Sequence, residues 1–238
     1  MAVKSAEEIQ AIATALRITE QAVEVMVQHA KPGVRVREVV GRMLGAMVSA
    51  GSDLGIQLLL SAAPRTPRVA GRIFPERALQ TGDVIINEIA GKYIGYHAQM
   101  HAPVSVGKKP GPEYMRLWDV ALAALNAGLA ILRPGLDTVE LAEAVRRPVR
   151  DAGLAANAMP LFKGMGVTIA EQPYSPHGVG RGGGLPQGTK LQEGMVILFE
   201  PAAYDERTQT GLHLSEQIVV TPDGYRRLGK LPVEFRST

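Results

Sequence analysis

Four stretches of the chain space their apolar residues three and four positions apart, as amphipathic helices do. The first stretch follows Ser5-Ala6-Glu7-Glu8, a capping-box pattern that predicts a long helix ending before Pro32-Gly33. The remaining helices are expected over Val36 to Ala50, from Pro112 to Pro134-Gly135, and over Thr138 to Ala152.

Shorter apolar runs between these helices predict strands. Ile56 to Leu60 is typical of a buried strand, and Val84 to Ile89 together with Tyr93 to Val106 predict a hairpin of β-branched and aromatic residues. The segment between them is rich in arginine and proline and is too irregular for a regular element. Leu161 to Leu228 is expected to hold short strands and glycine-rich loops.

An internal repeat organises these elements. Lys31-Pro32-Gly33-Val34 precedes the second helix with the spacing at which Arg133-Pro134-Gly135-Leu136 precedes the fourth. The matching strand segments make three equivalent pairs: Glu88 with Glu200, His97 with His213, and Gln99 with Ser215. The sequence therefore predicts an α+β fold of two pseudo-twofold-related helix-helix-hairpin units, formed as a single domain over residues 1–238.

Composition limits the chemistry that this chain can perform. None of the 238 residues is cysteine, which excludes disulfides, thiolate nucleophiles and cysteine-zinc sites. The 26 basic and 23 acidic residues are mixed along the chain and aromatic residues make up 5%, so no nucleic-acid partner is expected. The absence of an 18-residue apolar run and of a signal peptide predicts a cytoplasmic protein with no membrane partner.

Several short motifs point to a known family. They include Tyr93-Ile94-Gly95-Tyr96, His177-Gly178-Val179-Gly180 and Glu200-Pro201, in addition to the two Pro-Gly helix entries. In these motifs the chain resembles the pita-bread family of methionine aminopeptidases, proline-specific peptidases and creatinase over nearly its whole length. The resemblance implies the pita-bread fold, in which the duplicated units surround a curved antiparallel sheet, and a homodimer, because such relatives are often dimers.

The resemblance also implies where metal ligands would lie. Peptidases of this family hold two divalent ions with five ligands, whose positions fall on Glu88, Gln99, His177, Glu200 and Ser215. Two adjacent cations need bridging anions, and the bridging positions carry the neutral Gln99 and Ser215. We therefore expect no two-metal site and no cofactor. A single divalent ion on Glu88, His177 and Glu200 is the less favoured alternative.

Creatinase, which hydrolyses a C–N bond without metal, then suggests the main functional hypothesis. We expect a metal-independent hydrolase or lyase, not a peptidase, acting on a small, polar, carboxylate-bearing molecule at a C–N or neighbouring bond. The expected catalytic residues are His177, Glu200 and Glu88. Because alternate strand residues face one way, the expected substrate-binding residues are His97, Gln99, His101, His213 and Ser215, joined by the loop residues Arg72 and Arg181. A non-catalytic binding scaffold and a peptidase with one residual metal remain the alternatives.

Overall fold

The computed structural model describes residues 2–68, 70–71, 76–156, 161–175 and 188–238. The helices of this part of the chain are α1 (Ala6–His29), α2 (Val36–Ser49), α3 (Pro112–Ile131) and α4 (Thr138–Asp151). Its strands are β1 (Gln57–Ala63), β2 (Val84–Tyr93), β3 (Tyr96–Met100), β4 (Val104–Ser105), β5 (Ala155–Ala156), β6 (Phe162–Gly164), β7 (Glu171–Tyr174), β8 (Val196–Phe199), β9 (Ala202–Asp205), β10 (Thr210–His213), β11 (Glu216–Thr221), β12 (Gly224–Arg227) and β13 (Arg236–Ser237).

The helix predictions are confirmed, and local capping explains where two of the helices begin. At the start of α1, the Ser5 side chain accepts a hydrogen bond from the Glu8 amide, and the Glu8 carboxylate accepts one from the Ser5 amide. At the start of α4, the Asp137 side chain accepts a hydrogen bond from the Val139 amide. Both α2 and α4 end one residue before the predicted position.

The strands form three sheets in the described residues. Their orders are β1-β2-β4-β13 with β3 on β2, then β10-β9-β5, and finally β12-β11-β8-β6-β7. The predicted strand from Tyr93 to Val106 is divided into β3 and β4. The backbone amides between the two strands explain the division: the His101 amide donates to Ser215 Oγ, the Ala102 amide donates to Asn87 Oδ1, and Pro103 has no amide hydrogen.

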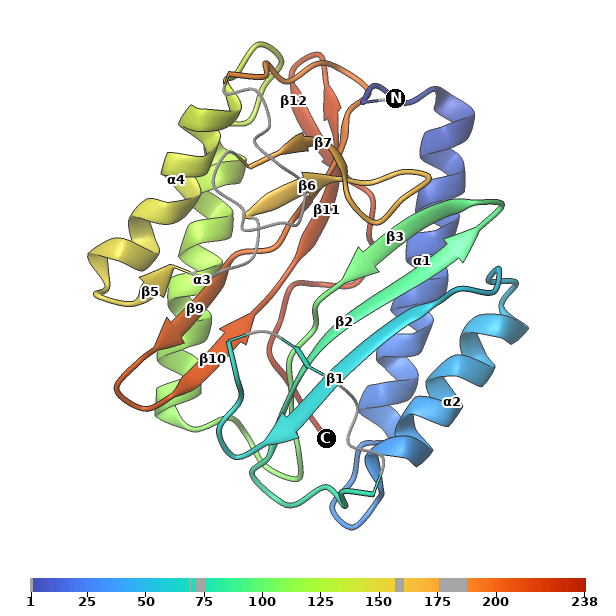
Figure 1. The fold of residues 1–238 in the computed structure, drawn as a ribbon, viewed down its shortest axis with the longest axis vertical. Helices are drawn as coiled ribbons and strands as arrows, with labels where there is room; N and C mark the ends of the chain where they lie inside the picture. Colours follow the sequence, from blue (N-terminus) through green and yellow to red (C-terminus); the bar gives the residue numbers. More distant parts are fainter. Residues whose placement is uncertain (1, 69, 72–75, 157–160, 176–187) are drawn as a thin grey trace.

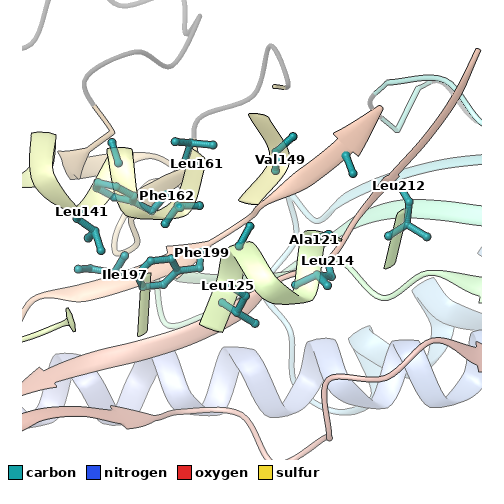
Figure 2. Close-up of a cluster of buried hydrophobic side chains, with 14 of the residues drawn as sticks. Ala121, Leu125, Leu141, Val149, Leu161, Phe162, Ile197, Phe199, Leu212 and Leu214 are labelled. Carbon is teal, nitrogen blue, oxygen red and sulfur yellow. The ribbon is translucent and has the colours of Figure 1, made fainter. Parts of the chain in front are cut away.

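In Figure 1, α3 and α4 lie on the left of the view and α1 and α2 on the right, and strands cross in front of both α3 and α1. Helix α1 packs against β2 and β3, and α3 packs against β9 and β10, while α2 packs on α1 and α4 packs on α3. The largest apolar cluster includes α3, α4 and the strands next to them. Figure 2 shows Phe162, Phe199 and Leu125 among its side chains, with the two phenylalanine ring centroids 5.8 Å apart. The predicted α+β class is therefore confirmed.

Hydrogen bonds from backbone amides in and after β3 to side chains at the start of β11 join the two halves of the fold. The Gln99 amide donates to Gln217 Oε1 at 3.2 Å, and the His101 amide donates to Ser215 Oγ at 2.7 Å. Polar residues of both halves are consequently buried together at this junction. None of the helices in the described ranges combines the length and the apolar character needed to cross a membrane.

Two mid-helix glycines provide a matched test of the packing of α3. A Cβ at Gly128 would lie 2.7 Å from Val145 Cγ2 and 2.9 Å from Phe199 Cε1, whereas a Cβ at Gly45 on α2 would meet no atom within 4 Å. We expect Gly128→Ala to lower the free energy of unfolding by about 1–3 kcal/mol through overpacking. We expect Gly45→Ala to raise it by about 0.5–1 kcal/mol through its helix propensity. Urea unfolding followed by the fluorescence of the single tryptophan, Trp118, measures both changes, and equal shifts would contradict this packing.

Candidate functional site

Glu88 lies in the middle of β2, among residues that are otherwise buried and mostly apolar. Its side chain accepts hydrogen bonds at Oε2 from Gln57 Nε2 at 3.2 Å and from Gln99 Nε2 at 3.3 Å. Strand pairing explains this arrangement, because Gln57 of β1 and Gln99 of β3 both lie opposite Ala90, two residues beyond Glu88 on the same face of β2. Neutral amide groups therefore solvate this carboxylate from both neighbouring strands.

Glu200 directly follows β8 in the other half of the fold and is 1% exposed. Its backbone amide donates to the Leu161 carbonyl at 3.0 Å, which fixes the position where the strand ends. Carboxylate Oε2 lies 3.2 Å from Lys163 Nζ and 3.6 Å from His101 Nε2. The other oxygen, Oε1, is buried and has no hydrogen-bond partner among the described residues. Glu200 thus has one oxygen in an ion pair and one oxygen available to a ligand.

Sequence reasoning missed Lys163. This residue lies in β6, which pairs with β8, and its side chain is 8% exposed. A buried carboxylate such as Glu200 needs a partner, which a protonated histidine or a ligand can supply. The structure shows a lysine ammonium there instead. The available signal was a lone lysine between Phe162 and Gly164 in an otherwise apolar segment, but nothing in that pattern links it to Glu200.

Two histidines complete the buried group, with His101 and His213 ring centroids 4.6 Å apart. His213 Nε2 lies 3.0 Å from the Asn87 carbonyl oxygen. Because a carbonyl only accepts, this nitrogen carries the hydrogen and Nδ1 is an acceptor. Nδ1 of His213 and both ring nitrogens of His101 are buried without hydrogen-bond partners in the described part of the chain. We call Glu88, Gln99, His101, Lys163, Glu200 and His213 the central polar cluster.

Burial dominates the protonation of this cluster. It raises the pKa of Glu200 to about 7, and repulsion from Glu88 adds to the rise while Lys163 opposes it. Burial likewise raises the pKa of Glu88, against the opposing effects of Lys163 and of the Gln99 hydrogen bond. It lowers the pKa of His213 to about 4 and that of His101 well below its usual value, so both imidazoles are neutral at pH 7.

The structure brings together most of the predicted site residues that it describes. Glu88, Gln99, His101, Glu200 and His213 belong to the central polar cluster, and Ser215 binds the His101 amide beside it. His97 is different: its amide donates to the Gly166 carbonyl, and no described hydrogen bond or ion pair joins its side chain to the cluster. The remaining predictions, His177, Arg72 and Arg181, lie outside the described residues.

The donor set decides which metal content fits. Among the described residues, no group of three or more histidine, aspartate or glutamate side chains is arranged to hold a metal ion. A pair of divalent ions does not fit, because Gln99 and Ser215 are neutral and Lys163 adds positive charge. A single ion fits the chemistry better, since Glu200 Oε1 and Gln99 Oε1 are buried oxygens without hydrogen-bond partners in the described ranges, and Glu88 is a second carboxylate.

Solved structures share this architecture over the whole chain. An X-Pro aminopeptidase from Thermotoga maritima superposes with a TM-score of 0.86 at 24% identity, covering 100% of this chain and 65% of that one. A prolidase from Pyrococcus furiosus superposes with a TM-score of 0.82 at 23% identity, covering 97% and 66% of the two chains. These likenesses define a protein of the pita-bread class, and the predicted fold is confirmed.

The chain belongs to metallopeptidase family M24, whose family model matches residues 10–222. A Xaa-Pro dipeptidase from Pyrococcus furiosus is 24% identical over 234 residues, which are 98% of this chain and 64% of the relative. A probable dipeptidase PepE from Mycobacterium bovis is also 24% identical, over 98% of this chain and 60% of the relative. The chain thus spans less than two thirds of the length of these curated relatives.

These findings correct two expectations. The hypothesis of a metal-independent hydrolase or lyase that is not a peptidase was wrong, because the chain belongs to a metallopeptidase family and its relatives are named dipeptidases. The expectation of no cofactor was wrong for the same reason. Its physical error was to extend an argument about bridging anions, which concerns a pair of ions, to a single ion that needs no bridge.

His213 gives the cluster a measurable pH dependence. The unfolded imidazole takes up a proton near pH 6.5 and the folded one near pH 4, so below pH 6.5 the unfolded state binds more protons. Between pH 7 and pH 4 the wild type should therefore lose about 3 kcal/mol of unfolding free energy relative to His213→Gln. Urea unfolding across this range measures the difference. His29→Gln on α1 is the matched control, and the same pH profile for the two variants would contradict the assignment.

Proposed function

We propose that this chain is a hydrolase of short peptides that works with one divalent ion. The observation that carries the proposal is that Glu88 from one half and Glu200 from the other are both buried and repel each other, while Glu200 Oε1 has no hydrogen-bond partner among the described residues. Membership of a metallopeptidase family and relatives named Xaa-Pro dipeptidase support peptides with proline in second position as the substrate class.

In this proposal Glu88 and Glu200 hold the ion together with His177, the histidine of the glycine-flanked motif. A bound divalent ion supplies polarisation of the substrate carbonyl and a more acidic water. The overall reaction adds water across the peptide bond: the hydroxyl joins the carbonyl carbon, the C–N bond breaks, and the leaving nitrogen takes a proton. His177 is thus a metal ligand in this proposal, not the acid-base residue of the metal-free hypothesis, and Arg72 and Arg181 remain predicted substrate contacts.

The neutral groups of the central polar cluster position the peptide in this proposal. The Gln99 side-chain oxygen and His213 Nδ1 are acceptors that no described residue binds, and they are suited to N–H groups of a substrate. His101 has both ring nitrogens available and, as a neutral imidazole, offers one donor and one acceptor. His97 and Ser215 also remain predicted substrate contacts. The single domain over residues 1–238, the homodimer and the cytoplasmic location remain predictions as well.

We expect the purified protein, supplied with Mn²⁺, to release proline from Xaa-Pro dipeptides and to leave Ala-Ala uncleaved. Chelation should abolish the activity, and readdition of Mn²⁺ should restore it. Glu200→Gln should lower kcat/KM by about 10²-fold or more, because it removes a carboxylate from the reaction centre. Glu113→Gln, at an exposed position in the first turn of α3, is the matched control.

Liquid chromatography of the released amino acids measures these rates. The proposal fails if the folded protein cleaves none of a panel of Xaa-Pro dipeptides with Mn²⁺, Co²⁺ or Zn²⁺ present. Thermal stabilisation by the same dipeptides without cleavage would identify a binding protein instead.

A further inference from the structure

Lys163 holds a positive charge at the place where the family pattern puts cations. Its Nζ lies 3.2 Å from Glu200 Oε2, and both side chains are almost completely buried, at 8% and 0% exposure. A buried ammonium without a partner costs several kcal/mol, so this charge is held there by the carboxylates around it.

The backbone fixes this position. Strand β6 pairs with β8 so that Lys163 lies opposite Leu198 and Phe162 opposite Phe199, one residue before Glu200. On the other side β6 pairs with β7, and a Cβ at Gly164 would collide with the backbone of Gln172. The strand that carries the lysine is therefore confined between two neighbours and cannot shift its register without breaking both ladders.

The charge of Lys163 acts on both halves of the fold. It favours the ionised form of Glu200 from its own half and that of Glu88 from the other, where it lowers the pKa of each carboxyl against the effect of burial. It also lowers the pKa of His101 and of His213. The Lys163 ammonium thus acts electrostatically on all four groups, and it is in direct contact with Glu200.

We propose that Lys163 replaces one of the two cations that metallopeptidases of this family hold, so that the cluster accepts one divalent ion and rejects a second. With both carboxylates ionised, Glu88, Glu200 and the ammonium leave a single net negative charge, which cannot offset two divalent ions in a buried site. Lys163 is accordingly a specificity-determining residue for the metal content. The inference rests on the proposed ion site but not on the proposed reaction.

Mn²⁺ binding to the substrate-free protein tests this inference by isothermal titration calorimetry. Lys163→Gln and Lys163→Met remove the charge, and both should bind Mn²⁺ about tenfold or more tightly than the wild type, because the repulsion between ammonium and ion is lost. Lys163→Arg keeps the charge and should bind like the wild type. Lys4→Gln is the matched control, since Lys4 is another buried lysine, paired with Glu171 at 2.8 Å outside the cluster, and it should leave the affinity unchanged.

Each outcome decides the question. Affinities of the neutral variants within about twofold of the wild type, or no Mn²⁺ binding by any variant, would overturn the inference. Neutral variants that fold only when Mn²⁺ is present would support it, because the ion then replaces the ammonium, whereas variants unfolded in both conditions would contradict it. Tighter binding in an enzyme that cleaves no dipeptide would leave the inference standing and reject the proposed reaction alone.

Discussion

Two carboxylates buried at the junction of the duplicated halves require compensating positive charge, and the rest of the site is arranged around that requirement. Glu88 and Glu200 repel each other and are both nearly excluded from water. Amide donors from Gln57 and Gln99 stabilise the first, and the Lys163 ammonium stabilises the second. Partial compensation leaves a site that is negative enough to attract one more cation or a donor-rich ligand.

The neutral residues at the two former bridging positions have structural roles here. Ser215 Oγ accepts from the His101 amide where β3 leaves its ladder, so a side chain of one half satisfies the backbone of the other. The Gln99 side chain donates to Glu88, and its backbone amide donates to Gln217. Carboxylates at these positions would bring two more negative charges into the same buried volume. Because Gln99 and Ser215 occupy these positions, hydrogen bonds join the two halves without the additional negative charges.

Local sequence patterns predicted the fold well because short segments of the sequence contain the signals that define its helices. The Ser5 capping box, the Pro-Gly helix entries and the duplicated spacing placed the four long helices of the described residues. The predicted strand across Tyr93 to Val106 was too long, because Ser215 and Asn87 interrupt it from elsewhere in the chain. Lys163 was not predicted for a related reason. The pairing of β6 with β8 brings it to Glu200, and sequence periodicity does not indicate which strands pair.

The neutral residues Gln99 and Ser215 do not decide whether the protein binds metal, because a site for one ion and a site for two ions have different requirements. Removing bridging anions raises the repulsion between two cations, but a single ion meets no such repulsion and needs only oxygen or nitrogen donors in reach. Within the described residues, the cluster still offers such donors in Glu200 Oε1, Gln99 Oε1, His213 Nδ1 and the His101 ring. Neutral residues at positions 99 and 215 lower the number of divalent ions whose charge the buried site can neutralise. An internal ammonium on a confined strand keeps that number low whatever the surrounding metal concentration, because the lysine is covalently part of the chain.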